Sequence, residues 1–279
     1  MKYNLISKFQ NSSKFHNSNF GRGAQYFLSL VTIPFLAACT VDSTTLSDSD
    51  ILANFFVQND NGEASVLVTL TTENLSGSND VTLTRREALF FQQDGQIVEL
   101  SEEDDGEYAA SLPANSSGLF TFIIERLSQE DIDDNRAYLP DTFQELVAEP
   151  VQIGPVIELS WRVDDTQQSI NGFTVPAAVE SFNAVASCQS PGSDNTPFTL
   201  ALSEGQITQE GGRQLLEIAV IEQLTQVLNL SAELAASTTC EFDVQLVRDI
   251  TGTTDNALDN RSNAGGQTLL NVPIQWSAQ

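Results

Sequence analysis

The sequence predicts an all-β fold made of two β-sandwich domains. Short apolar stretches with a period of two residues recur along most of the chain, and clusters of Gly, Asn, Asp and Ser separate them. A period of two places one face of a strand in the core and the other face in solvent. Many short strands separated by turn residues are typical of sandwiches.

The first predicted domain covers residues 51–150. Its expected strands are 51–57, 65–71, 80–85, 88–92, 96–100, 107–112 and 118–126. Asp94-Gly95 lies between two of these strands and predicts a hairpin, because this pair tolerates the positive φ angles of a type I′ turn. Residues 128–153 lack the alternation, so we expect an acidic linker there and a domain boundary at about residue 150.

One corner of the first domain carries Asp104, Gly106 and Tyr108 at alternate positions. This spacing resembles the Asp-x-Gly-x-Tyr-x-Cys run of immunoglobulin-like domains. The resemblance implies an immunoglobulin-like first domain in which the Tyr108 hydroxyl bonds a backbone group and locks the corner. Ala110 stands where that family has cysteine, so the family's core disulfide is not expected here. The resemblance concerns the fold and implies no activity.

The second predicted domain covers residues 151–279. Its alternating stretches are 157–163, 182–188, 228–234, 240–246 and 270–276. Apolar residues also recur at helical spacing within 215–236, which keeps a helix open as a second interpretation of that segment. Trp161 and Trp276 are in phase with the apolar positions, so we expect both in the core.

Cys188 and Cys240 are predicted to form a disulfide. They are the cysteines left after Cys39, and both lie on apolar strand faces, as an inter-sheet disulfide requires. In an oxidising compartment two such cysteines usually pair. Closing a loop of roughly 50 residues should stabilise the fold by about 4 kcal/mol in the chain-entropy model.

Residues 1–38 have the features of a secretory signal peptide. The leader carries Lys2, Lys8, Lys14 and Arg22 and no acidic residue, and an apolar run at 27–36 follows. That run is shorter than the roughly 20 residues that span a bilayer.

The run ends in Leu36-Ala37-Ala38-Cys39, which resembles the lipobox of bacterial lipoproteins. The resemblance implies a diacylglyceryl group and an acyl chain such as palmitate on Cys39, which would anchor the protein in the membrane. Thr40, rather than Asp, follows the cysteine and favours the outer membrane. Residues 39–50 are rich in Ser, Thr and Asp, so we expect a lipidated, flexible tether. An ordinary signal peptide with an incidental cysteine is the alternative.

Composition excludes several classes of enzyme for the processed chain. His16 is the only histidine, and it lies in the leader together with every lysine. Ser-His-Asp catalysis, a Lys Schiff base, a P-loop and a His-rich zinc site are therefore not expected. The formal net charge of −26 also argues against a nucleic-acid partner. A carboxylate-pair glycoside hydrolase and an oxygen-ligand calcium site remain open.

The candidate calcium ligands are Asp131, Asp133 and Asn135, which alternate as at the start of a calcium loop. Arg136 and Thr142 stand where an EF-hand needs glycine and an acid, so a solvated acidic linker is the alternative interpretation. Apart from calcium, no cofactor is expected. A second polar cluster at 255–260 predicts either a solvated loop or a binding loop.

The sequence thus predicts a non-catalytic, lipid-anchored envelope protein that presents sandwich loops to a protein or glycan partner. One alternative is a calcium-dependent adhesion or carbohydrate-binding module. The other is a glycoside hydrolase that uses a pair of carboxylates.

Overall fold

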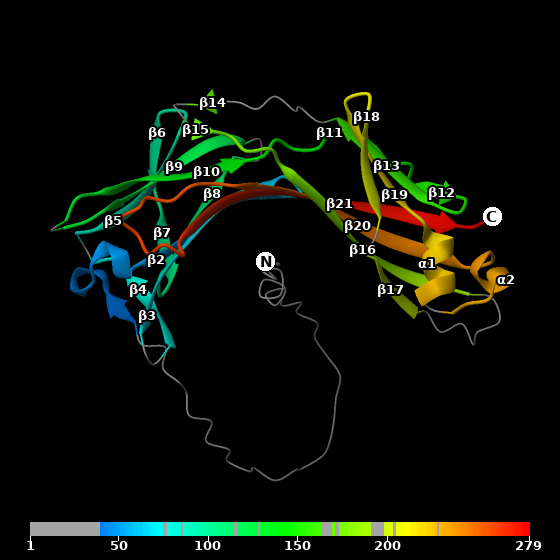
Figure 1. The fold of residues 1–279 in the computed structure, drawn as a ribbon, viewed down its shortest axis with the longest axis horizontal. Coiled ribbons are helices and arrows are strands. Elements are labelled where there is room, and N and C mark those ends of the chain that lie inside the picture. The colour runs from blue at the N-terminus through cyan, green and yellow to red at the C-terminus, as the bar shows by residue number, and fades with distance from the viewer. Residues whose placement is uncertain are drawn as a thin grey trace, which may run out of the picture. The chain divides into compact units, whose positions relative to one another are not determined.

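The computed structural model describes residues 40–74, 77–84, 86–113, 116–127, 129–162, 169–170, 173–190, 198–202, 205–227 and 229–279. These residues are mostly strand and belong to one compact unit (Figure 1). The described helices are α1 (Val220–Val227), α2 (Ala232–Ala235) and two 3₁₀ turns at Ser43–Thr45 and Asp48–Asp50. The predicted all-β class is therefore confirmed.

One 11-stranded sheet runs through both halves of the sequence. Its main path is β1 (Val41–Asp42), β4 (Gly77–Thr82), β3 (Glu63–Asn74), β2 (Leu52–Asp60), β21 (Asn263–Ser277), β20 (Thr239–Thr251), β16 (Val179–Gln189) and β17 (Phe198–Leu202). Its branches are β7 (Ser101–Asp104), β8 (Glu107–Leu112) and β12 (Val151–Ile153). The long strands β20 and β21 pass from one end of this sheet to the other (Figure 1).

Smaller sheets cover this large sheet. One contains β10 (Ile132–Leu139), β9 (Gly118–Glu125), β5 (Ala88–Gln93) and β6 (Gln96–Glu99). Another contains β11 (Gln144–Val147), β13 (Ile157–Arg162), β19 (Arg213–Ile218) and β18 (Gln206–Glu210). The remaining pair is β14 (Ser169–Ile170) and β15 (Phe173–Thr174).

Two main hydrophobic cores result, so the fold is two sandwiches that share one sheet. In the first, β2 and β3 pack against β5 and β9. In the second, β16, β20 and β21 pack against β13 and β19. Leu258 and Ala264 come from the second half of the sequence but pack in the first core. The predicted boundary at residue 150 therefore separates neither the cores nor the sheets completely. Residues from both sides of it contribute to each core, and β21 pairs with strands of both halves.

The predicted strands of the first half agree closely with the structure. The Asp94-Gly95 hairpin joins β5 to β6, with φ angles of 49° and 78° at its two central residues, as a type I′ turn requires.

The expected acidic linker, in contrast, is wrong at its centre. Residues Ile132–Leu139 form β10, which pairs with β9 through an irregular register between Ile132 and Asn135. This bulge breaks the two-residue period and hides the strand from the sequence pattern.

Tyr108 locks the corner as the immunoglobulin-like resemblance implies. Its buried hydroxyl accepts a hydrogen bond from the Leu83 backbone N–H at 2.8 Å and donates to Oε1 of Glu102 at 3.3 Å. Burial raises the pKa of Tyr108 well above its ordinary value, so the phenol stays protonated.

Tyr108→Phe is expected to destabilise the protein by about 1–2 kcal/mol, because the Leu83 amide loses its partner in a half-buried site. Thermal unfolding followed by circular dichroism should show a lower Tm, by roughly 2–8 °C for a chain of this size. An unchanged Tm would show that the hydroxyl does not contribute to the corner.

The expected flexible tether is also wrong from residue 41 onward, because this segment folds onto the first core. Strand β1 pairs in parallel with β4, so that Val41 is the register partner of Val81. Arg126 then holds the following turns: its guanidinium donates to the carbonyl oxygens of Ser43 at 2.9 Å and Leu46 at 3.2 Å. The polar composition that suggested a tether instead supplies the caps of the two 3₁₀ turns.

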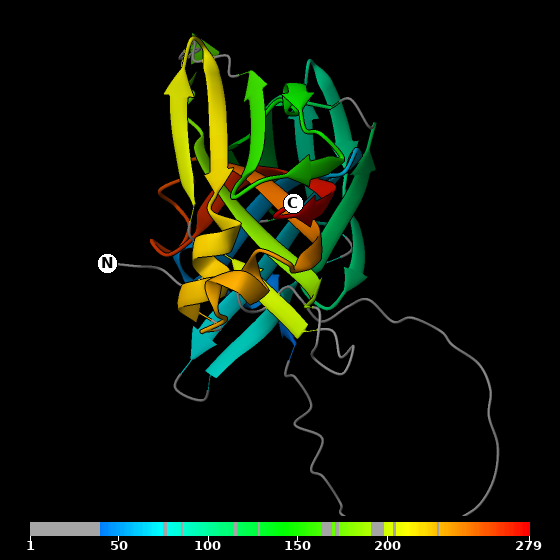
Figure 2. The ribbon, with the colours of Figure 1, turned by 90° about the vertical axis from the view of Figure 1, so that its right-hand side faces the viewer.

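In the second half, the strand predicted at 228–234 is wrong and the helical alternative is correct. Val220 and Leu224 are fully buried on one side of α1, as their helical spacing allows. Figure 2 shows α1 and α2 together at the base of the β18–β19 hairpin. The predicted core positions of Trp161 and Trp276 are confirmed, since both side chains are buried.

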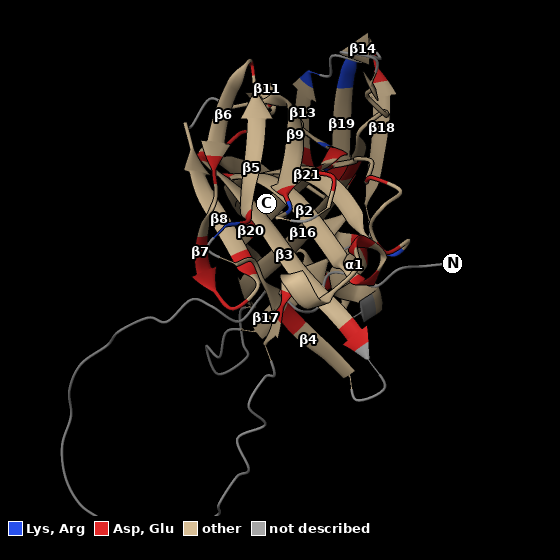
Figure 3. Ribbon diagram, turned by 90° about the vertical axis from the view of Figure 1, so that its left-hand side faces the viewer, with Lys and Arg blue, Asp and Glu red and all other residues tan. Residues whose placement is uncertain are grey.

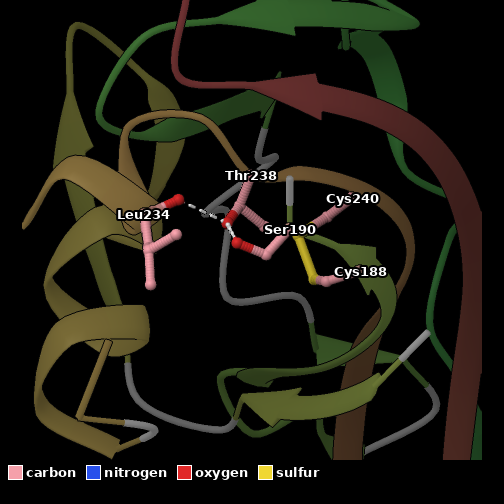
Figure 4. The surroundings of a disulfide bond; sticks show 5 residues. All are labelled: Cys188, Ser190, Leu234, Thr238 and Cys240. Atoms are coloured by element: carbon pink, nitrogen blue, oxygen red, sulfur yellow. Dashed lines mark hydrogen bonds between the residues drawn. A yellow bond between two sulfur atoms is a disulfide. The ribbon is translucent and has the colours of Figure 1, made fainter. Parts of the chain in front are cut away.

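The predicted disulfide is confirmed, but it joins neighbouring strands and does not join two sheets. Cys188 of β16 and Cys240 of β20 are direct register partners, with 4.1 Å between their Cα atoms. Beside the disulfide, the Thr238 hydroxyl donates to the Leu234 carbonyl at 2.7 Å and lies 3.2 Å from the Ser190 hydroxyl (Figure 4). The cross-link therefore lies where α2 returns to the sheet.

Candidate binding groove beside strand β12

Strand β12 is a short edge strand bracketed by two prolines. It pairs in parallel with the end of β21, and the described strands give it no second partner. Pro150 precedes it and Pro155 follows it after Gly154. Because proline has no backbone N–H, the pairing segment is limited to about three residues.

The main chain of β12 uses alternate residues to bond β21. The Pro150 carbonyl accepts from the Gln275 N–H at 2.8 Å, and the Gly154 N–H donates to the Ser277 carbonyl at 3.0 Å. Successive residues of a strand direct their backbone groups to opposite edges. The backbone groups of Val151 and Ile153 therefore face the edge that β21 does not cover.

Gln152 holds β12 beside β13. Its side-chain amide accepts from the Glu158 N–H at 2.8 Å and donates to the Glu158 carbonyl at 2.9 Å. These two hydrogen bonds replace those that a neighbouring strand would make. They bond the backbone groups of Glu158 on β13 at a point that β11 does not reach. A third contact, from the same amide to the Glu149 carbonyl at 3.3 Å, fixes the turn into β12.

A groove of about 330 Å³ lies between β11, β12 and β13. Its lining includes Val147, Val151 and Ile153, whose exposed fractions are 54%, 58% and 70%. Three exposed aliphatic side chains in one concave site are unusual, since a folded chain normally exposes such residues singly.

The charge at the groove is negative. Glu149 and Glu158 belong to its lining, and the lining residues that the structure describes include no basic side chain. Arg162 and Arg213 lie on β13 and β19, and both contact Glu145 of β11 at 3.3 Å. Figure 3 shows acidic residues, in red, on many of the described elements and basic residues, in blue, on few.

A second hollow of about 390 Å³ lies on the outer face of the large sheet. Val151 lines it together with polar residues such as Ser187, Glu241 and Gln275. Because Val151 also lines the groove, β12 forms the ridge between the two hollows.

Each half also contains a buried arginine–glutamate pair away from the groove. In the first, Arg126 Nε contacts Glu87 Oε1 at 3.1 Å and Nη1 contacts Asp48 at 2.9 Å. In the second, Arg248 Nε lies 3.2 Å from Glu180, which accepts the Trp161 indole N–H at 2.8 Å.

These environments shift several carboxyl pKa values. Burial alone raises the pKa of Glu87, but hydrogen bonds from Ser43, Leu127 and Thr84, together with the charge of Arg126, bring it below its ordinary value. Burial raises the pKa of Asp48 and of Asp249. None of these carboxyl groups belongs to the described lining of the groove. The acids with shifted pKa values therefore have structural partners and offer no carboxylate pair at the groove.

The three candidate calcium ligands differ in their surroundings, since Asp131 and Asp133 are exposed and Asn135 is not. Asn135 is buried, its amide donates to the carbonyls of Phe122 and Ile132, and its oxygen accepts from the Asp255 N–H at 2.9 Å. Asp131 accepts from the Arg126 backbone N–H at 3.3 Å. In the described part of the chain, no three His, Cys, Asp or Glu side chains are grouped to hold a metal ion. The bonds of Asn135 instead tie β10 to the loop after β20.

The predicted lipidation site, Cys39, lies outside the described residues. No helix within the described segments is both long enough and apolar enough to cross a membrane. The groove was missed by the sequence interpretation. Its only local signal is the run from Pro150 to Pro155, in which Val151 and Ile153 alternate with Gln152.

Comparisons with known proteins give no family for this chain. No protein-family model matches, and no curated protein matches. Solved structures match weakly. A 1.5-MDa bacterial ice-binding adhesin has 8% identity and a TM-score of 0.21, over 83% of this chain and 67% of that chain.

The D0-D1 domain of Intimin has 9% identity and a TM-score of 0.21, over 81% of this chain and 100% of that chain. The Bacteroides ovatus mixed-linkage glucan utilization locus protein SGBP-B, in complex with a heptasaccharide, has 10% identity and a TM-score of 0.16, over 89% and 67%. At these TM-scores the similarities carry no argument about function, and the chain is assigned to no family.

Proposed function

We propose that the protein is a non-catalytic, lipid-anchored envelope protein that binds a protein partner in the groove beside β12. The observation that carries the proposal is the exposure of Val147, Val151 and Ile153 in one concave site. Burying such side chains against a partner is favourable by roughly 25 cal/mol per Å² of apolar area. Leaving these three side chains exposed to water does not stabilise the fold itself.

The chemistry of the groove favours a protein over a glycan. Its exposed side chains are aliphatic, whereas sugar rings stack on flat aromatic faces. Both tryptophans are buried, and their indole N–H groups donate to Glu180 and to the Gly154 carbonyl. Both indole rings pack in the core and are not exposed for stacking on a sugar ring.

The N-terminal segment packs on the first core, which supports a groove that faces away from the membrane. If Cys39 carries lipid, only Thr40 separates it from β1, and two residues reach about 7 Å at most. The lipid would then hold the β1–β4 end of the large sheet close to the bilayer. Strand β12 pairs with the opposite end of β21 from β2, so the groove would project away from the membrane (Figure 1).

Replacing the three aliphatic residues by serine should abolish partner binding without unfolding the protein, because all three side chains are solvent-exposed. The measurement is affinity purification of tagged full-length protein from gently solubilised membranes, with quantitative mass spectrometry. The matched control is Ile97→Ser with Val98→Ser and Val185→Ser, which removes exposed aliphatic side chains elsewhere.

A stoichiometric partner that is lost with the groove variant and kept with the control would support the proposal. A partner captured equally by both variants would show that the groove is not the binding site. A protein that purifies alone would contradict it, and a glycan array with and without calcium would then test the alternative modules.

Cys39→Ser is expected to release the protein from membranes or to leave it unprocessed. The reason is that the serine hydroxyl cannot form the thioether to diacylglycerol. Membrane fractionation and intact mass report the two outcomes. Unchanged membrane association together with an unchanged mass would contradict the anchor.

A further inference from the structure

We infer that the partner enters this groove as an extended segment of alternating aliphatic and basic residues that adds a strand to the open edge of β12. The inference rests on the proposed function and names the chemistry of the partner. Three properties of β12 carry it: the backbone edge that no described strand covers, the spacing of its side chains and the charge around it.

The backbone supplies the first property. The register with β21 directs the backbone groups of Val151 and Ile153 toward the uncovered edge, as the bonds of Pro150 and Gly154 to β21 require. An added strand satisfies such groups directly, as in other cases of β-augmentation. The two flanking prolines limit the added pairing to about three residues, which protects the edge from unselective pairing.

The side chains supply the second property. Val151 and Ile153 are two residues apart, so they lie on the same face of β12, while Gln152 lies on the other and is held by Glu158. A strand added beside them would place its own alternate residues against this pair. Its matching positions should therefore be aliphatic.

The charge supplies the third property and selects the occupant. Glu149 and Glu158 line the groove and Glu241 lines the adjoining hollow. A segment with Lys or Arg between its aliphatic residues complements them. A second copy of this chain would bring the same acids and a formal net charge of −26, so like-charge repulsion opposes self-pairing at this edge.

The test uses a fluorescent peptide of alternating Lys and Val and the full-length protein in detergent, with binding followed by anisotropy. We expect saturable binding that weakens by at least about tenfold when alternate backbone nitrogens of the peptide are methylated, because the strand bonds are then lost. Replacing every Lys of the peptide by Glu should abolish binding.

The protein variants locate the site. Val151→Ser with Ile153→Ser should weaken peptide binding, whereas the control Val179→Ser with Val185→Ser, also at exposed positions, should not. Glu149→Gln with Glu158→Gln should weaken it by roughly twofold to fivefold for each charge removed.

The outcomes separate this inference from the proposed function. Equal binding of the methylated peptide would overturn strand addition, and equal binding of the Glu peptide would overturn the charge argument. If no peptide binds while the membrane partner still depends on the groove, the inference fails and the proposed function stands. Concentration-dependent dimerisation that is lost on Val151→Ser would show a second copy at this edge and would also overturn the inference.

Discussion

Arg126→Met should destabilise the protein by roughly 3–5 kcal/mol, because it leaves the buried Glu87 carboxylate without its counter-ion. Both side chains of this pair are about 1% exposed, so water cannot replace the lost contact. The same change removes the donors to Ser43 and Leu46, which frees the N-terminal segment from the first core. Urea unfolding followed by fluorescence and circular dichroism would measure the effect.

Two comparisons make this prediction specific. Adding Glu87→Gln to Arg126→Met should recover a substantial part of the loss, because the unpaired charge disappears. The matched control is Arg261→Met, which removes an exposed arginine that contacts Asp259 and Glu73. We expect it to cost much less than Arg126→Met, because exposed ion pairs contribute little to stability. If both variants lost a similar free energy of unfolding, burial would not be what makes the Arg126 ion pair important.

The deficit of Arg126→Met should also depend on pH. In the intact protein the pKa of Glu87 is lowered, so its contribution to stability is complete above the pKa of an unfolded Glu and is lost as pH falls through the folded pKa. In the variant, burial is no longer opposed by the arginine charge, so the carboxyl protonates at a higher pH. The difference in stability between the two proteins should therefore shrink as pH falls toward about 4.

Replacing both Cys188 and Cys240 by alanine should cost about 4 kcal/mol, since the disulfide closes a loop with a sequence separation of 52. For a chain of this size the Tm should fall by roughly 8–16 °C. Thermal unfolding without reductant is the measurement. Alanine avoids a new polar group in a site where both cysteines are buried.

Reductant provides the control for the disulfide. It should lower the Tm of the wild-type protein toward that of the double variant and leave the variant unchanged. The strand pairing of β16 with β20 should survive in both, because register partners flank the cysteines along the whole of β16. Reaction of these two cysteines with an alkylating agent in unfolded, unreduced protein would contradict the bond.

Local sequence patterns predicted the elements that are specified by residues close together in the sequence. Asp94-Gly95 fixed a hairpin, and the two-residue period predicted the buried faces of β13, β16 and β20. The pattern failed at β10, where a bulge between Ile132 and Asn135 shifts the register. It also failed near residue 230, where a two-residue and a helical spacing coincide and burial of Val220 and Leu224 selects the helix.

The candidate site depended on contacts that no local pattern contains. Val151 and Ile153 lie within residues 128–153, where the sequence predicts a linker, so no sequence pattern marked them as part of a strand. Among the strands that the structure describes, β12 pairs only with β21, which lies more than 120 residues later in the chain, and this single pairing leaves Val151 and Ile153 exposed. Likewise, the segment after residue 40 has the composition of a tether, and only the distant Arg126 makes it part of the first core.

The sequence by itself thus determined the all-β class, the pairing of Cys188 with Cys240, the corner at Tyr108 and the acidic character of the surface, because each follows from residue type and short-range spacing. Only the tertiary structure decided that the two sandwiches share one sheet and that a hydrophobic edge beside β12 stays open. Those features depend on which distant strand pairs with which, and pairing is chosen by the burial of both cores together.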